Sequence, residues 1–276
     1  MSPLDAANLI TKALLYAVSL GAIGAALHGA LGMMASRRAY FRLAGLVAVA
    51  AILRLIILNA QMGGSLSAAL SAEQFGWTWT AGGPPALALL VGAGFLIVAG
   101  LLHHRVLLMP AAISISASFA LTGHSAGLEA PGFAPWIVAG HLLIAGFWFA
   151  APATLWPRSG MKDADVLART EAFSRVARVI VPFVFLSGIY LFWRFNDGFY
   201  GLLSSGYGQL LASKLLAATL LLGLGAVNLM FVTRQLAAQP ARGRAALRAT
   251  LRAEAILFAV IVIIIAAATT VSGPTT

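Results

Sequence analysis

The chain has 276 residues, of which 61% are hydrophobic and only 9% are charged. Soluble domains carry about 25% charged residues, so this chain cannot cover a water-facing surface, and its solvent must be lipid over most of its area. The formal net charge of +10 does not indicate nucleic acid binding, because the cations lie in short segments between apolar runs. No cysteine is present, which excludes disulfides, thiolate metal sites and cysteine nucleophiles.

Apolar stretches of about 20 residues, long enough to cross a bilayer, recur along the whole sequence. They predict an all-α polytopic membrane protein, an eight-helix bundle that forms a single transmembrane domain over residues 1–276. The predicted spans, in chain order, are residues 8–35, 41–60, 84–103, 106–123, 135–156, 176–195, 208–236 and 251–272.

Prolines lie at the start of, or inside, three of these spans. Pro84, Pro85 and Pro135 are expected where helices start, a position that proline tolerates. Pro182 falls inside the sixth span and is expected to kink it. The segment 157–175, which has mixed charge, is expected to form either a short amphipathic helix that leads into the sixth span or a solvated connector.

Positive charge alternates between the loops, and this alternation predicts the orientation. The even-numbered loops 61–83, 124–134 and 196–207 contain no lysine or arginine. The odd-numbered loops are expected in the cytoplasm by the positive-inside rule, which places both termini on the outer side. The cations of the odd loops and their edges are Arg37, Arg38, Arg42, Arg105, Arg158, Lys162, Arg169, Arg175, Arg178, Arg234, Arg242, Arg244, Arg248 and Arg252.

Two histidines on the outer side are the strongest candidates for chemistry. His124 closes the fourth span and His141 lies about two turns into the fifth, and a short loop joins these helices. Imidazole and methionine thioether are good copper ligands, so His124, His141 and Met62, at the outer end of the second span, are candidate metal ligands. The alternative is that His124 binds a loop carbonyl and His141 binds a neighbouring helix.

A second candidate metal site lies toward the inner side. It would combine one histidine of the first span with sulfur and imidazole groups near the inner boundary. Against it, histidines beside arginine are ordinary boundary residues and methionine in a span usually packs. The residues concerned are His28, Met33, Met34, His103 and His104.

A few other polar or aromatic residues at membrane depth are candidates for a pathway or for structural roles, because ionisable groups there are costly. Lys214 and Arg54 are interpreted as balancing a carboxylate, orienting an anion or extending toward the headgroups. Glu254 and Asn228 lie in the inner halves of the last two spans, and Trp148 shares a helix face with His141. Lys214 and Glu254 are each expected to have a partner on another helix or to be hydrated.

An ordered series of short motifs runs through the second half of the chain, and through it the chain resembles the copper resistance protein D family over roughly residues 114–276. The first third matches less well, since Lys12 is followed by Tyr16 where the family often carries a histidine after an arginine. The motifs are Thr122-Gly123-His124-Ser125-Ala126-Gly127, His141 with Phe147-Trp148, Phe173-Ser174-Arg175, Ser187-Gly188, Tyr207-Gly208-Gln209-Leu210-Leu211 before Lys214, Asn228, Arg252-Ala253-Glu254 and Ser272-Gly273-Pro274.

The resemblance implies a multi-pass protein of the bacterial inner membrane that moves copper from the periplasm to the cytoplasm and contributes to copper homeostasis or resistance. Its implied partners are the lipid bilayer, a copper ion as Cu(I) or Cu(II), and a periplasmic copper-binding protein of the C type. Two alternatives remain: an electron-transfer protein with b-type haem between His124 and His141, and a membrane copper acceptor or sensor that does not transport. No nucleotide-binding glycine loop or catalytic triad is present, so an enzyme is not expected.

Overall fold

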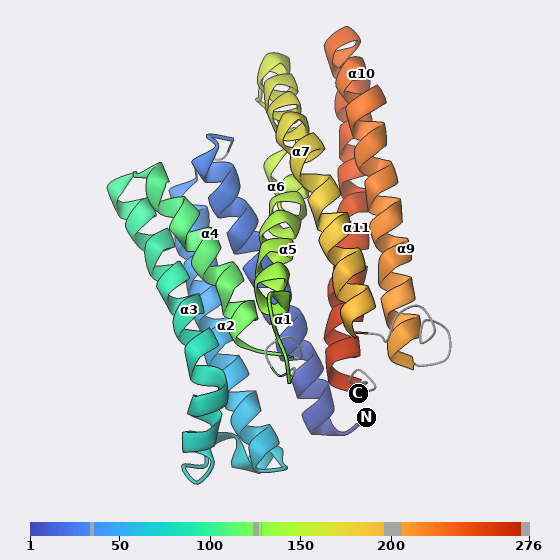
Figure 1. Ribbon diagram of the computed structural model, residues 1–276. Helices are drawn as coiled ribbons and strands as arrows, with labels where there is room; N and C mark the ends of the chain where they lie inside the picture. Colours follow the sequence, from blue (N-terminus) through green and yellow to red (C-terminus); the bar gives the residue numbers. More distant parts are fainter. Residues whose placement is uncertain (34–35, 124–126, 128, 196–205, 272–276) are drawn as a thin grey trace.

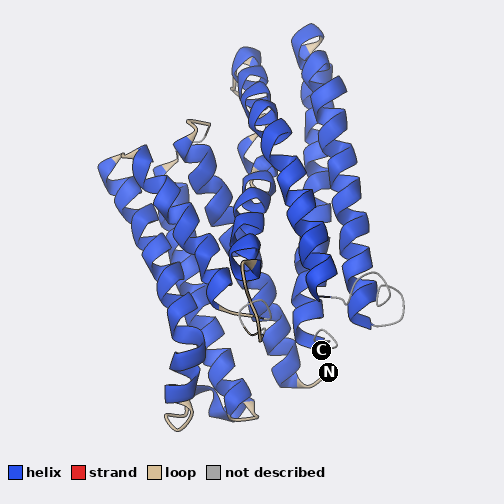
Figure 2. Ribbon diagram, viewed as in Figure 1, coloured by secondary structure: helices blue, strands red, loops and turns tan. Residues whose placement is uncertain are grey.

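Helices account for the regular structure of the protein (Figure 2). The computed structural model describes residues 1–33, 36–123, 127, 129–195 and 206–271, and this part of the chain contains no strand. Seven of its helices are long and apolar enough to cross a membrane, and an eighth apolar segment, Arg105–Leu121, is shorter. A length of 17 residues is about the lower limit for a membrane-spanning helix. The predicted all-α polytopic membrane bundle is therefore confirmed.

The first half of the chain supplies four spans. They comprise α1 (Pro3–Ala30), α2 (Arg37–Met62), the 3-10 helix η1 (Leu66–Leu70), α3 (Phe75–Leu102), and then η2 (Arg105–Leu107), α4 (Leu108–Ala117) and η3 (Ser118–Leu121), which together form the short span.

The second half supplies the other four. They comprise α5 (Ala134–Phe149) with the single turn α6 (Ala151–Thr154), α7 (Asp163–Phe195), then α9 (Gly206–Val227) continued by the π-helix η4 (Asn228–Val232) and α10 (Thr233–Ala238), and finally α11 (Pro240–Val271).

Local sequence explains several helix ends. Ser2 caps α1 in a capping box with Asp5, which satisfies backbone N–H groups that the first turn leaves free. The Ser36 side chain caps α2 by accepting from the Ala39 N–H. His103 ends α3 with a left-handed φ of 60°, a conformation that histidine adopts more readily than most side chains.

The third span begins earlier than predicted. The helix α3 starts at Phe75, and Pro84 and Pro85 lie inside it, so the prediction that they mark its start was wrong. The proline φ is compatible with a helix, and each proline removes only one backbone donor. The turns before them are anchored by the buried Thr78, whose hydroxyl donates to Asn59 Oδ1 on α2 at 2.8 Å. The contact with α2 thus keeps α3 helical through two prolines that, from the sequence alone, suggest the start of a helix.

The sixth span also begins earlier. The helix α7 runs without interruption from Asp163, so most of the segment 157–175 is the first part of the spanning helix rather than a separate short helix or a connector. Asp163 and Asp165 lie in its first turn, where negative charge favours the helix dipole. Pro182 lies within α7, and the helix continues on both sides of it.

The two larger of three hydrophobic clusters divide the bundle. The first is built mainly from α1–α4, and the second from α5, α7, α9 and α11. Figure 1 shows these two groups of helices side by side. The helix α1 contacts α2 and α4 on one side and α5 and α11 on the other, so it joins the two groups.

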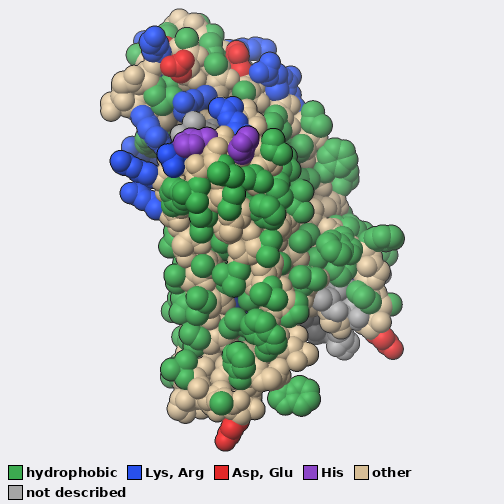
Figure 3. All heavy atoms as spheres, turned by 90° about the vertical axis from the view of Figure 1, so that its left-hand side faces the viewer, with side chains coloured by type: hydrophobic (Ala, Val, Ile, Leu, Met, Phe, Trp, Pro, Cys, Tyr) green, Lys and Arg blue, Asp and Glu red, His purple; other side chains and the backbone are tan. Residues whose placement is uncertain are grey.

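The two ends of the bundle differ in charge. The start of α1 and the end of α11 lie at the same end of the bundle in Figure 1, here called the terminal end. Lysine and arginine side chains gather at the other end, here called the basic end, and apolar side chains cover the middle of the face in Figure 3. Arg37 begins α2, Arg105 begins η2, and Arg242 lies in the first turn of α11, all at the basic end.

Candidate functional site

His141 lies between three helices of the second group. It is about two turns into α5, and its Nδ1 lies 2.9 Å from Ser187 Oγ on α7. Gly188 lies against the ring, since a Cβ there would be 3.4 Å from His141 Cε1. Lys214 of α9 is also close to the imidazole.

The Ser187 hydroxyl has a choice of partners, and that choice bears on which nitrogen of His141 carries the proton. Its Oγ donates its single hydrogen to a backbone carbonyl of its own helix, that of Phe183 at 2.7 Å or that of Val184 at 3.1 Å. When it does so, the oxygen only accepts, and His141 Nδ1 carries the hydrogen of the bond to Ser187. Nε2 is left with its lone pair, which is the form of imidazole that binds a metal.

The other two predicted outer ligands are His124 and Met62. His124 lies outside the described residues, although η3, which ends three residues before it, packs against α5. Met62 is the last residue of α2 and is 47% exposed at the terminal end. Because α2 packs mainly against α1 and α3, the structure does not bring Met62 together with His141. The described residues contain no group of three or more histidines and carboxylates that could hold a metal.

The candidates for an inner metal site are not gathered either. His28 is fully buried, with Nδ1 2.9 Å from Thr154 Oγ1 and its ring edge-on to Phe147 and Phe173. Met33 is buried in the first hydrophobic cluster, and Met34 lies outside the described residues. His103 and His104 are exposed at the end of α3, so they have a different environment from that of His28.

Arg54 joins α2 to α1 in the half of the bundle near the terminal end. One of its terminal nitrogens donates to Asn8 Oδ1 at 2.7 Å and to Thr11 Oγ1 at 3.2 Å. Lys12 lies beside it and donates to the Thr269 carbonyl of α11. Arg54 therefore has neutral partners, and no carboxylate in the described residues pairs with it.

Glu254 is the most deeply buried acid of the described chain. It lies on α11 with 2% of its surface exposed, and its Oε1 accepts from Asn228 Nδ2 at 2.9 Å. The Trp148 side chain of α5 also lies beside the carboxylate. The Asn228 Oδ1 accepts from Thr250 Oγ1 at 2.6 Å. As expected, Glu254 has partners on other helices.

Some residues of these networks were not predicted. Thr250 and Ser187 received no role from the sequence alone, because single hydroxyls in an apolar span usually bond their own helix. The spacing of Thr250 and Glu254 was a usable signal, since residues four apart share a helix face. Lys214, by contrast, has no hydrogen-bond or ion-pair partner among the described residues, so the prediction of a partner on another helix is not confirmed for it.

The comparison with protein families decides the family of the second half. Residues 167–268 match the family model of copper resistance protein D. This chain carries a copper resistance protein D domain. No curated protein and no solved structure matches the chain.

The copper resistance protein D domain covers most of the polar network just described. It begins in α7 and ends in α11, and it contains Ser187, Lys214, Asn228 and Glu254. His141 lies before the matched residues but contacts Ser187 within them. The protein is thus a multi-pass membrane protein whose residues 167–268 match a family named for copper resistance.

Proposed function

We propose that the protein takes up copper at its terminal end and moves it across the bacterial inner membrane to the cytoplasmic side, in support of copper homeostasis or resistance. The observation that supports this proposal is the 2.9 Å contact between His141 Nδ1 and Ser187 Oγ, because donation from Nδ1 to Ser187 would leave Nε2 of a membrane-embedded imidazole available to a metal. The copper resistance protein D domain supports copper as the metal.

His141 and His124 are the proposed first ligands. The short segment between η3 and α5 keeps the two histidines near in sequence, and imidazole suits copper in either oxidation state. Met62 is proposed as an entry contact at the same end, because its thioether is partly exposed on α2. A site with so few ligands releases its ion readily, which permeation requires.

Lys214 strengthens the argument for a transient site. Its side chain lies close to His141, and no carboxylate of the described residues pairs with it. A positive charge beside the imidazole opposes a second positive charge, so copper held there would be bound weakly. The proposed donor of the ion is a periplasmic copper-binding protein of the C type.

The test is copper binding by purified variants. We expect His141→Ala and His124→Ala each to lower the copper bound per protein, and the double variant to abolish both binding and cellular copper uptake. His104→Ala, which removes an exposed histidine at the basic end, is the matched control and should bind normally. A correctly folded double variant that still binds and moves copper would refute the proposal. A visible spectrum with haem bands would favour the electron-transfer alternative.

The role of Ser187 can be tested separately. Removing the partner that orients a metal-binding histidine typically weakens metal affinity by about 10–100-fold. We therefore expect Ser187→Ala to raise the copper Kd by about that factor, and Ser187→Thr, which keeps the hydroxyl, to restore it. Ser213→Ala is the control, because the Ser213 hydroxyl also bonds its own helix but is exposed. Equal affinity in all variants would show that the Ser187–His141 bond only supports packing.

A further inference from the structure

Glu254 is a carboxylate enclosed by three membrane helices. It lies on α11 and is approached by Asn228 from η4 and by Trp148 from α5, with only 2% of its surface exposed. A buried charge without a counter-ion is among the most expensive features of a membrane protein. In the described part of the chain no lysine, arginine or histidine forms an ion pair with it.

The charged groups around Glu254 make other contacts. On α11 itself, Arg252 lies over the Trp156 ring and Arg248 donates to the Pro157 carbonyl. On α1, His28 bonds Thr154. The charged residues of α7 in this region, Glu171, Arg175 and Arg178, line a cavity beside η4. The partners of Glu254 are therefore neutral, so they can contact its side chain both as a charged carboxylate and as a protonated carboxylic acid.

Asn228, which donates to Glu254, lies where the helix that begins as α9 becomes irregular. Residues Asn228–Val232 form a π-helix between α9 and α10, a feature that is rare and often found at functional sites. The Asn228 side chain bridges two groups of α11, donating to Glu254 and accepting from Thr250. Thr233 donates to the Asn228 carbonyl at 2.8 Å and so partly satisfies the loosened backbone.

A polar cavity of about 270 Å³ reaches this irregular turn. Its walls come from α7, η4 and α10, and it is large enough and polar enough to hold water. Because Leu229 and Thr233 belong to the wall, the cavity lies one helix turn or less from Asn228. The residues of the wall are Glu171, Ser174, Arg175, Arg178, Leu229 and Thr233.

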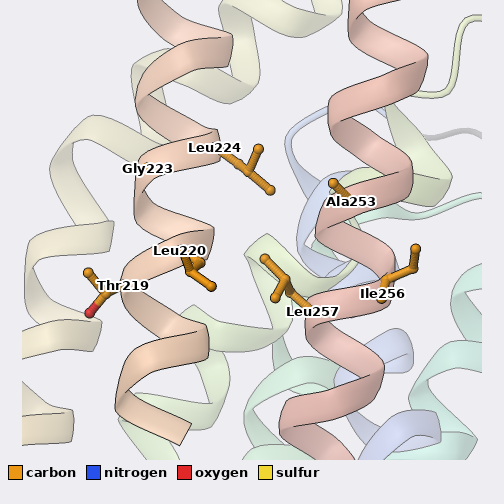
Figure 4. A pocket seen from close by; sticks show the side chains of 7 residues that line it. All are labelled: Thr219, Leu220, Gly223, Leu224, Ala253, Ile256 and Leu257. Carbon is orange, nitrogen blue, oxygen red and sulfur yellow. The ribbon is translucent and has the colours of Figure 1, made fainter. Parts of the chain in front are cut away.

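The opposite approach to Glu254 is apolar. A groove of about 550 Å³ lies between α9 and α11, where side chains such as Leu220, Leu224 and Leu257 face one another (Figure 4). Ala253, the neighbour of Glu254, also lines it, and Thr219 is its one hydroxyl-bearing residue. This groove suits lipid chains, so it offers no route for a proton.

We propose that Glu254 is a proton-binding site that links copper movement to proton movement across the half of the membrane near the basic end. In one state its carboxylate accepts from Asn228, with Trp148 beside it. In the other it holds one proton on a carboxyl oxygen, which it receives from the terminal-end side of the bundle as copper passes and gives up to water in the polar cavity beside η4. The inference rests on the proposed transport of copper, and it adds the proton as the ion that moves with copper.

The test uses full-length protein in liposomes loaded with a pH-sensitive dye. We expect wild-type protein to move protons together with copper, and its copper flux to respond to an imposed pH difference. Glu254→Gln keeps the shape and the hydrogen-bond capacity but cannot exchange a proton at neutral pH. This variant should bind copper with unchanged affinity in detergent, yet lose the proton flux and the response to pH difference.

Control variants distinguish a failure of the proton coupling from a failure of copper transport itself. Glu73→Gln removes an exposed carboxylate before α3 and should behave as wild type. Asn228→Leu, with one donor to Glu254 removed, should shift the pH at which copper flux is half-maximal. A Glu254→Gln protein with normal proton coupling, or wild-type copper flux that ignores pH difference, would overturn this inference alone. Absence of copper flux in wild type would overturn the proposed function and this inference with it.

Discussion

Asn59 organises the loop between α2 and α3. Its Nδ2 lies 3.0 Å from the Ala68 carbonyl and 2.9 Å from that of Ser71, and its Oδ1 accepts from the buried Thr78 hydroxyl. One amide thus ties the end of α2 to η1 and to the first turns of α3.

Replacing Asn59 by leucine should loosen this loop. The buried Thr78 hydroxyl loses its acceptor, and an unsatisfied buried polar group costs about 1–3 kcal/mol. We expect a lower midpoint of thermal unfolding in detergent and faster proteolysis within residues 63–74. Gln61→Leu, a similar change at an exposed position two residues away, should leave both unchanged. Identical behaviour of the two variants would show that the loop does not depend on the Asn59 amide.

Single residues show which contacts could be predicted from the sequence and which could not. Glu254 and Asn228 were singled out because polar groups at membrane depth are costly, and the structure joins them. His28 was grouped with His103 and His104 by approximate depth alone. Depth does not fix the rotation of a helix about its axis, and His28 faces Phe147 and Thr154 instead.

At the scale of helices, the contact of α1 with α5 depends on two glycines. A Cβ at Gly24 would overlap the Gly146 backbone oxygen and the Ala150 Cβ, and a Cβ at Gly146 would lie 2.6 Å from Ile23 Cγ2. Small residues permit such close approach between membrane helices. This contact also joins the two groups of helices, because α1 belongs to the first and α5 to the second.

Gly24→Ala should therefore destabilise the protein. The clash is with backbone, which moves little, so we expect a loss of about 1–3 kcal/mol, as for overpacked cores. Gly140→Ala on α5 is the matched control, since nothing lies within 4 Å of a Cβ there. It should be neutral or slightly stabilising, because alanine favours helix more than glycine does. The comparison is made by thermal unfolding in detergent, and equal midpoints would contradict the close contact.

The sequence predicted which segments form helices better than it predicted where those helices begin and end. Apolar length identified every span, because lipid demands about 20 apolar residues whatever the neighbours are. The start of α3 at Phe75 could not be predicted from Pro84 and Pro85, since it depends on Thr78 bonding Asn59 of another helix. The π-helix at Asn228–Val232 has no local sequence signal for the same reason.

For the whole molecule, the segregation of charge predicts the orientation. An alkaline phosphatase fused after Thr276 should be active, because that enzyme folds only outside the cytoplasm, and the same enzyme inserted at Gly160 should be inactive. Gly160 lies between α6 and α7 at the basic end, where Arg244 bonds Asp163 at 2.6 Å. A reversed pattern of activities would place the basic end outside and would contradict the direction of copper movement proposed above.

The crowding of cations at the basic end also has an electrical consequence. A bacterial membrane is negative inside, and moving one elementary charge across it against a potential of 100 mV requires about 2.3 kcal/mol of work. An inverted copy would have to carry Arg37, Arg105, Arg242 and their neighbours outward, so the work would add up over every one of them. With the basic end in the cytoplasm, as proposed, the membrane potential of an energised cell would hold the inserted bundle in one orientation, and the proposed copper route would keep one polarity throughout the cell.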